Sequence, residues 1–340
     1  MNNRRLSIKE ALIRLYNHRY EDYTLFLRTK ENHGKASLFA KFTEFKFSKF
    51  ICIVKSINRE ELSQFIIRVN DFVSTKTRRR FINLLELICK RYIGILRKCY
   101  CSNPAGAILD LGRLLGANNH QLMKYIIEPL INYCSYAINQ KAILYRVRDE
   151  EEGKDVDNCW HTPFYIRQHC HSGRFSTPSF PCLYLGQEVE TCVSETGEIK
   201  PGNKRWLGEF RIKGNKPLIA LDLRFPSESA IKNFDDYDTF CAFLSYPLRL
   251  LCGIYAHNKS DSFAEEYLFS QLLINLLSNQ VDDNLGLTTI YGVMYDSTKN
   301  KGGINYAFPA IPQNYPPKED EKVSERLMNL FVHNKPAQLI

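Results

Sequence analysis

The stretch GRFSTPSFPCLYLGQEVETCVSE, residues 173–195, decides how the second half of this chain folds. Its middle part, PCLYLG at 181–186, is a short apolar run bounded by Pro and Gly, which predicts a strand. A short helix is expected from Glu188 to Glu195. Tyr184 therefore stands near a strand end and Glu195 at a helix end, 11 residues later. We expect the two side chains to meet if the intervening residues fold back, since such ends carry much of the chemistry of α/β proteins.

Other runs around this stretch follow the same strand pattern, each β-branched or aromatic and bounded by Gly, Pro, Asn or Asp. They are ILYRVR (143–148), WLGEFRIK (206–213), PLIALDL (217–223) and TIYGVMY (289–295). Two helical patterns interrupt them, at 240–255 and 262–280. The polar stretch 149–178 predicts a long loop, and loops of that length in compact domains are usually functional or disordered.

The first 140 residues predict helices. Asn58 with Glu61 resembles a capping box, and apolar residues then recur at helical spacing up to Phe72. A second helix is expected from about Thr77, a third opens at Ser102 with Pro104, and a fourth covers 120–138 with a kink at Pro129. The segment 39–54 fits either a strand or a helix. After a Pro-Pro break, the C-terminus predicts one amphipathic helix packed on the surface.

The fold class predicted is α+β. We expect an α-helical, basic N-terminal domain of unknown role at 1–140, a mixed α/β domain at 141–312, and a C-terminal tail with one amphipathic helix at 313–340, because 340 residues exceed one typical domain. No apolar run reaches the roughly 18 residues that a membrane span needs. The N-terminal stretch fails as a secretory signal because Lys9, Glu10 and Arg14 interrupt it. A cytoplasmic protein is expected, with no membrane partner.

The net charge of +9 is unevenly distributed. Residues 1–140 hold 24 Lys or Arg against 11 Asp or Glu, and the remainder holds 22 against 26. Such a basic half is suited to nucleic acid or an acidic partner. Its charges, however, are interleaved with apolar residues at helical spacing, and only Arg78 to Arg80 form a run. We interpret them as a solvated helix face and do not expect nucleic acid as a partner.

Eleven cysteines are predicted to be reduced thiols, because their number is odd and their density is low. The closest grouping is CWHTPFYIRQHCH at 159–171, which offers two thiols and three imidazoles, the ligands that zinc prefers. It lacks a second CxxC half. We therefore expect no metal.

Five polar residues of the second half, Arg146, Arg174, Tyr184, Glu195 and Ser297, lie at the ends of apolar runs. Arginines bind phosphates, an aromatic ring stacks on a ligand ring, and a carboxylate stabilises developing positive charge. A dinucleotide with a nicotinamide riboside has all three of these parts. Each residue also has a structural interpretation, as an ion-pair partner, a core aromatic, a solvated helix residue or a turn former.

The order of these residues resembles that of the RES family, named for an Arg, a Glu and a Ser, whose members are toxins of bacterial toxin–antitoxin pairs. The matching pieces contain LYRVR, GRFSTPSFPCLYLG, ETCVSE, EEYLFSQLL and GVMYDSTKNKGGIN. The resemblance implies an ADP-ribosyltransferase-like fold that binds NAD as its substrate and splits nicotinamide from ribose by hydrolysis or phosphorolysis. It also implies an antitoxin or another neutralising protein as a partner; a homo-oligomer stays open.

The resemblance assigns roles to individual residues. Glu195, Arg146 and Tyr184 would be catalytic, with Glu195 facing the ribose and Tyr184 beside the nicotinamide. Arg146 and Ser297 would hold the phosphates and the adjoining ribose, with Arg174 in the same cleft. Arg148, two residues after Arg146 on the same strand face, leaves open which arginine faces the cleft.

Two insertions depart from the family pattern, at 149–171 and 227–261, and a lidded or remodelled cleft would follow from them. Two alternatives to NAD cleavage remain at this point. One is transfer of ADP-ribose to a macromolecule docked on the basic half. The other is a catalytically silent interaction module.

Overall fold

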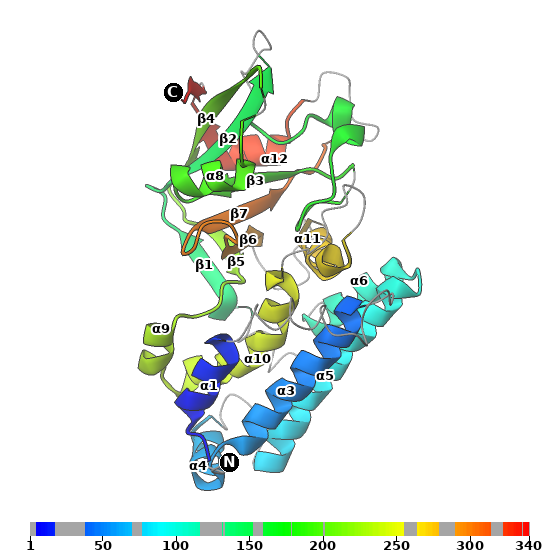
Figure 1. Ribbon diagram of the computed structural model, residues 1–340, viewed down its shortest axis with the longest axis vertical. Helices are drawn as coiled ribbons and strands as arrows, with labels where there is room; N and C mark the ends of the chain where they lie inside the picture. The colour runs from blue at the N-terminus through cyan, green and yellow to red at the C-terminus, as the bar shows by residue number, and fades with distance from the viewer. Residues whose placement is uncertain are drawn as a thin grey trace. The chain divides into compact units, whose positions relative to one another are not determined.

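The computed structural model describes residues 5–17, 38–69, 77–115, 131, 133–151, 159–177, 179–199, 201–254, 264–278, 290–313, 322–334 and 336–339. The chain forms two compact units (Figure 1). A helical unit comprises Met1–Cys134, Phe225–Lys259 and Glu265–Leu276; a sheet unit comprises Ser135–Arg224, Ser260–Ala264 and Leu277–Ile340. Helices and a mixed sheet in largely separate stretches confirm the α+β class. The boundaries expected at 140 and 312 stay a prediction about functional domains.

The helical unit is built from helices of three separate chain segments. They are α1 (Ile8–Asn17), α3 (Leu38–Ser56), α4 (Arg59–Arg68), α5 (Arg78–Tyr100), α6 (Pro104–Leu114), α9 (Glu228–Asn233), α10 (Asp236–Gly253), the short η3 (Glu265–Tyr267) and most of α11 (Leu268–Ser278). The segment that fitted either a strand or a helix is thus a helix, α3. Phe72 and residues 120–130 lie outside the described residues.

The predicted helix starts in this unit are confirmed by their caps. The Asn58 side chain accepts hydrogen bonds from the backbone N–H groups of Glu60 and Glu61, at 2.9 and 3.3 Å. Only this half of the expected capping box forms, because the Glu61 carboxylate accepts instead from the backbone N–H of Ile8 at 3.0 Å. Thr77 caps α5 through the N–H of Arg80. Such caps satisfy N–H groups that have no partner within the helix.

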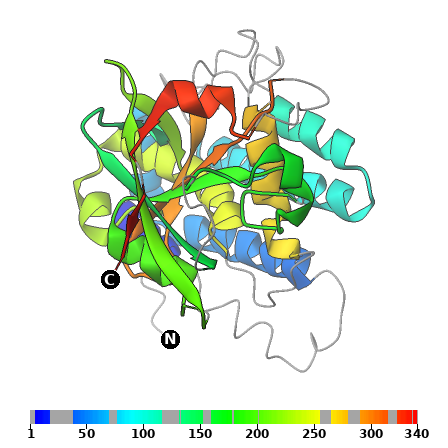
Figure 2. The same ribbon diagram turned by 90° about the horizontal axis from the view of Figure 1, so that it is seen from above.

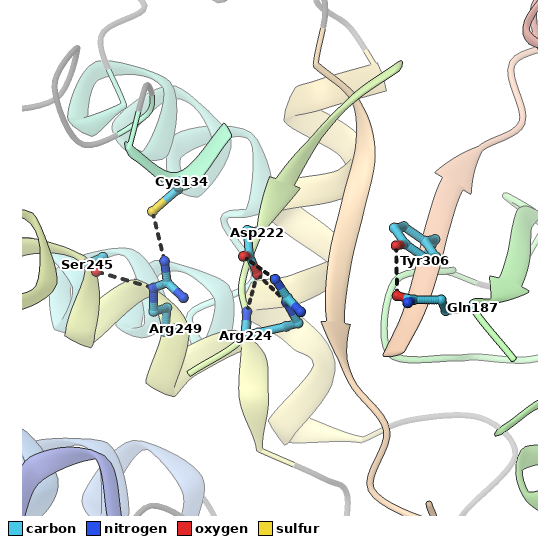
Figure 3. A network of polar contacts seen from close by, with 7 residues as sticks. All are labelled: Cys134, Gln187, Asp222, Arg224, Ser245, Arg249 and Tyr306. Carbon is cyan, nitrogen blue, oxygen red and sulfur yellow. Dashed lines mark hydrogen bonds and ion pairs between the residues drawn. The ribbon is translucent and has the colours of Figure 1, made fainter. Parts of the chain in front are cut away.

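Helix α10 forms the core of the helical unit, although the sequence places it inside the second predicted insertion. All of its residues from Thr239 to Gly253 are buried. Tyr16 donates to the carbonyl of Ala242 at 2.7 Å, and Arg249 donates to the Ser245 hydroxyl at 3.2 Å (Figure 3). The apolar residues of α10 complete the helical core, and the lidded or remodelled cleft expected from this insertion stays a prediction.

The described residues of the sheet unit form nine strands in one mixed sheet. They are β1 (Ser135–Ile138), β2 (Ile143–Glu151), β3 (Cys182–Gly186), β4 (Asn203–Ile212), β5 (Leu218–Asp222), β6 (Ile290–Asp296), β7 (Ile304–Pro309), β8 (Phe331–His333) and β9 (Ala337–Gln338). Their order is β1-β5-β6-β7-β3-β2-β4-β8, with β9 beside β4. The pair β5–β6 is parallel and the other pairs are antiparallel.

The sheet divides where β2 leaves β3. The two strands pair at Tyr145 and Gly186, whereas β2 pairs with β4 along its whole length, from Ile143 to Glu151. Figures 1 and 2 show β2 and β4 crossing β3 and β7 steeply. Beyond Tyr145, β2 therefore turns away from β3. Arg146 lies on β2, Tyr184 on β3 and Glu195 on the helix that follows β3.

Three further elements belong to the sheet unit: η2 (Phe164–His169), α8 (Val189–Thr196), which carries Glu195, and α12 (Glu325–Leu330). The strands predicted within 143–148, 181–186, 206–213, 217–223 and 289–295 are confirmed, as is the short helix that ends near Glu195. The expected long polar loop is partly core, because Trp160 and Phe164 belong to the buried apolar cluster.

One prediction about the end of an element is wrong. Residues 135–138 were expected to end a helix and instead form β1, which pairs with β5. The error arises because pairing with a distant strand overrides the local pattern. The amphipathic C-terminal helix expected on the surface is confirmed as α12, since Leu327 is buried while Glu325, Met328 and Asn329 are exposed. After α12 the chain continues into β8 and β9, which the sequence patterns did not indicate. Among the described residues, none of the helices is long and apolar enough to cross a membrane.

Candidate functional site

Glu195 and Ser297, 102 residues apart, are joined by a direct hydrogen bond. Glu195 lies in the last turn of α8, and Ser297 directly follows β6. The Ser297 hydroxyl donates to Glu195 Oε1 at 2.7 Å. The same oxygen of Ser297 accepts from the backbone N–H groups of Lys299 and Asn300, at 3.2 and 3.0 Å. Ser297 is thus both the turn former and a contact of the carboxylate.

Asn305 is a third member of this group, and the sequence analysis did not select it. It lies on β7, is 5% exposed, and donates from Nδ2 to Glu195 Oε1 at 2.9 Å. Both side-chain hydrogen bonds that Glu195 makes with described residues therefore fall on Oε1. The position of the carboxylate is fixed through one oxygen, and Oε2 stays free to face a ligand. Asn305 stands two residues after the Gly302-Gly303 pair, and an Asn so near a turn has the turn as its default interpretation, so no local signal identified it.

Helix α8 is held at its start by close packing and at its end by an ion pair. A Cβ atom on Gly186 would lie 2.4 Å from Cys192 Sγ, so only glycine fits there. The Cys192 thiol donates to the carbonyl of Tyr145 at 3.2 Å. At the helix end, Arg205 donates to the carbonyl of Gly197 at 2.7 Å and forms a two-fold ion pair with Asp149 at 2.8 and 2.9 Å. These contacts fix the helix that carries Glu195.

The Tyr184 hydroxyl organises the turn that precedes β3. It accepts from the backbone N–H of Phe175 and donates to the hydroxyl of Ser176, both at 3.1 Å. A Cβ atom on Gly173 would lie 2.9 Å from this hydroxyl. Burial raises the pKa of Tyr184 well above its usual value, so the phenol stays neutral. These contacts agree with the structural interpretation of Tyr184 as a core aromatic residue whose hydroxyl is hydrogen-bonded. A contact between the Tyr184 ring and a ligand stays a prediction.

Arg174 is linked to the Glu195 group through Tyr295 on β6. Its guanidinium lies over the Tyr295 ring, and Tyr295 pairs with Asn305, which contacts Glu195. The Arg174 side chain is 8% exposed, and its guanidinium carbon is 5.0 Å from the centre of the Tyr295 ring. Tyr295 on β6 is paired in register with Asn305 on β7. The positive charge of Arg174 is therefore held over an aromatic face, a favourable arrangement, one strand away from the Glu195 carboxylate.

Arg146 carries a buried positive charge that has no acidic partner among the described residues. It lies on β2 opposite Gly208, and its Nη1 atom is buried without a hydrogen-bond partner. Burial, followed by repulsion from Arg148, lowers the pKa of Arg146 to about 10, while the Tyr184 phenol and the Cys192 thiol act in the opposite direction. The guanidinium is still charged at neutral pH. Within the described residues, no hydrogen bond joins it to Glu195 or Ser297.

The predicted site residues are therefore brought together in two groups. Glu195 and Ser297 are in contact, with Arg174 one strand away. Arg146 lies on β2, near enough to Tyr184 for the phenol to act toward a higher pKa of Arg146. Arg148 pairs with Trp206 and lies on the same strand face as Arg146, as expected from its spacing. Which of the two arginines faces a ligand stays a prediction.

His161, from the group considered as zinc ligands, has a structural role. Its Nδ1 donates to the carbonyl of Thr162 at 2.7 Å, and its Nε2 accepts from the backbone N–H of Ser324 at 2.9 Å. Burial lowers the pKa of His161 to about 4. In the described part of the chain, no group of three or more His, Cys, Asp or Glu side chains is placed to hold a metal ion. All eleven cysteines are free thiols.

The chain belongs to the RES domain family. The RES domain model matches residues 143–323, more than half of the chain, and this range contains every residue of the site described above. The resemblance seen in the sequence is therefore confirmed. A relative from Bacillus subtilis (strain 168), described as "Putative toxin YopC", is 29% identical over 203 residues. That alignment covers 54% of this chain and 44% of YopC, so the chain spans less than half of that relative's length. No solved structure matches the chain.

Proposed function

We propose that this chain binds NAD and cleaves the bond between nicotinamide and ribose. The observation that carries the proposal is the Glu195 carboxylate, fixed through Oε1 by Ser297 and Asn305 while Oε2 stays free. Nicotinamide leaves as a neutral molecule, and the ribose then develops oxocarbenium-like positive charge. A preorganised carboxylate stabilises such charge by several kcal/mol, about 3 to 4 for one well-placed group.

The remaining site residues would bind the rest of the dinucleotide. Arg146 has a buried charge and an unused donor, which suits a diphosphate. Arg174 adds a second positive charge, and the turn at Ser297 would contact the phosphates or the adjoining ribose. Tyr184 would lie beside the nicotinamide. Water or phosphate would then attack the ribose, which gives ADP-ribose or its 1-phosphate, and we propose an ADP-ribosyltransferase-like fold for the sheet unit on this basis.

Depletion of NAD would make this chain a toxin acting in the cytoplasm, which its membership of the RES family and its similarity to YopC support. An enzyme of this kind requires control. We therefore propose a neutralising protein, such as an antitoxin, that covers the Glu195 group until the activity is needed. Homo-oligomerisation would be a second means of control.

The experiment is incubation of the purified chain with NAD, with and without inorganic phosphate, followed by separation of the products. We expect nicotinamide release, with ADP-ribose in water and its 1-phosphate in phosphate. Glu195→Gln keeps the shape and removes the charge, so turnover should fall by about 10² to 10³. Glu190→Gln on the same helix is the matched control, because Glu190 is exposed and should change nothing. Near-normal turnover by Glu195→Gln would exclude the proposed role of the carboxylate.

A second candidate function is transfer of ADP-ribose to a macromolecule. The basic residues of α5 support it, because Arg79, Arg80, Lys90, Arg91 and Arg97 are all exposed. In the sequence these basic residues are interleaved with apolar ones, whereas in the folded helix their charged side chains are all exposed to solvent. A polyanion docked there would be the acceptor. NAD labelled in its adenosine part distinguishes the two functions, since transfer labels the macromolecule and cleavage leaves all label in small products.

A further inference from the structure

Two buried polar atoms without partners belong to strands that flank β4 in the sheet unit. Five side-chain nitrogen or oxygen atoms of the described residues are buried without a hydrogen-bond partner, and two of these are Arg146 Nη1 on β2 and His333 Nε2 on β8. Buried polar atoms are nearly always hydrogen-bonded, because each unsatisfied one destabilises the fold. Two of them on either side of one strand suggest a group that would accept from both.

The register of the sheet brings the two side chains to one face. On β4, Phe210 pairs with Leu144 on one side and with His333 on the other, and Gly208 pairs with Arg146. Residues two apart on a strand share a face, so His333 and Arg146 both lie on the Phe210 side of the sheet. A Cβ atom on Gly208 would be 2.8 Å from His333 Nε2. The tip of the imidazole thus occupies the space above Gly208, directly beside the start of the Arg146 side chain.

Contacts on the other sides hold the imidazole in this position. Its ring centre is 4.5 Å from that of Phe210 and 5.7 Å from that of Trp160. The Cys159 side chain fills the remaining space over Gly208, where its Cβ would be 2.6 Å from an added methyl group. Burial, followed by the charge of Arg146, lowers the pKa of His333, so the ring is neutral at pH 7. A neutral ring has one N–H, which Nε2 can carry.

These features select the kind of group that fits. Arg146 and His333 do not hydrogen-bond each other, and Arg148 adds positive charge nearby. An oxygen that accepts from both atoms gains most if it is anionic, because hydrogen bonds from a guanidinium to phosphate are about twice as strong as neutral ones. The aromatic surroundings would strengthen such a contact further, since they exclude water.

We propose that Arg146 Nη1 and His333 Nε2 together bind one phosphate oxygen, and that His333 is a ligand-binding residue contributed by the C-terminal strand β8. His333 lies beyond the RES domain match, which ends at residue 323, so this contact is an addition that the family match does not contain. The identification of the phosphate as part of the NAD diphosphate rests on the proposed function. The pairing of the two side chains around an anion does not.

The test uses pyrophosphate as the probe and isothermal titration calorimetry of the purified full chain. His333→Phe keeps the aromatic packing and removes Nε2, and we expect its affinity for pyrophosphate to fall about tenfold, equivalent to about 1.4 kcal/mol. Arg146→Met should lose more, because it removes the charge. His169→Phe is the matched control and should bind as the wild type, because His169 is an exposed histidine of η2.

A second pair of variants covers the case in which His333→Phe does not fold. In His333→Gln the amide nitrogen reaches about as far as Nε2, whereas in His333→Asn it falls short. Affinity kept within threefold by Gln and reduced about tenfold by Asn supports the proposal. Equal affinities of these two variants would overturn it, as would wild-type affinity in His333→Phe or a wild-type chain that does not bind pyrophosphate.

NAD turnover of the same samples separates this inference from the proposed function. If the wild type binds pyrophosphate through His333 and cleaves no NAD, the anion site stands and the proposed function fails. If the wild type cleaves NAD and His333→Phe binds pyrophosphate unchanged, the function stands and the inference is wrong.

Discussion

Replacement of Ser297 by alanine should destabilise the sheet unit by about 3 kcal/mol. The hydroxyl is almost fully buried, donates to the Glu195 carboxylate, and accepts from the N–H groups of Lys299 and Asn300. A hydrogen bond to a charged group contributes about 1.5–3 kcal/mol and a neutral one about 1 kcal/mol. The two N–H groups will recover part of this by binding water, which reduces the total to about 3 kcal/mol.

Tryptophan fluorescence during urea unfolding measures this change in the right part of the molecule. The chain has two tryptophans, Trp160 and Trp206, and both lie in the sheet unit. The free energy of unfolding follows from the midpoint and slope of the transition. Ser194→Ala is the matched control, because Ser194 makes one hydrogen bond, to the carbonyl of Glu190 within α8, and should change the free energy little.

A double-mutant cycle isolates the contact with the carboxylate. Ser297→Ala and Glu195→Gln should be non-additive, with a coupling energy of about 1–2 kcal/mol, because the two side chains are in direct contact. A loss below about 1 kcal/mol in Ser297→Ala, or additive effects in the cycle, would refute the assignment of Ser297 as the residue that fixes Glu195.

Three further predictions concern the sheet unit. Asp149→Asn should cost about 2–4 kcal/mol in the same unfolding assay, because it leaves the charge of Arg205 buried without its partner, and Glu209→Gln, in a more exposed and longer ion pair with Arg211, should cost far less. Burial lowers the pKa of His161 to about 4, so the unfolded state takes up a proton at a higher pH than the folded state does. The free energy of unfolding should therefore fall by about 3 kcal/mol as the pH drops from about 6.5 to 4. His161→Asn should lack this part of the pH dependence. Gly186→Ala should displace α8 and reduce both stability and NAD turnover, because the added Cβ would lie 2.4 Å from Cys192 Sγ. The double variant with Cys192→Ala should recover part of both losses. No recovery would contradict this packing argument.

The elements that sequence patterns predicted correctly are those with strong local signals. The start of α5 near Thr77, the cap at Asn58, and the strand–helix order around Tyr184 and Glu195 all follow from periodicity and capping chemistry. Strand β1 was missed because four residues after a helical pattern carry little signal of their own, and its pairing with β5 decides its conformation. Strands β8 and β9 were missed for the same reason.

The candidate site was predictable in part. Glu195 and Ser297 stand at the ends of a helix and a strand, positions where chemistry is concentrated, and the structure joins them. Asn305 contacts Glu195, which is 110 residues away, and only the folded sheet creates this contact. His333 is likewise brought to the sheet face of Arg146 by strand pairing alone, which no local pattern indicates. The fourth helix, expected at 120–138, is confirmed at the described residues 131, 133 and 134, which are helical, and is wrong at 135–138, which form a strand.

The position of α10 in the chain has a consequence for biosynthesis. The N-terminal helices are synthesised well before residues 236–253. More than a hundred further residues must be translated before α10 can pack against the apolar faces of these helices. The strands β1 to β5 are translated during that interval. Neither unit corresponds to one continuous piece of the gene, and each unit therefore obtains all of its packing partners only after most of these residues have been translated.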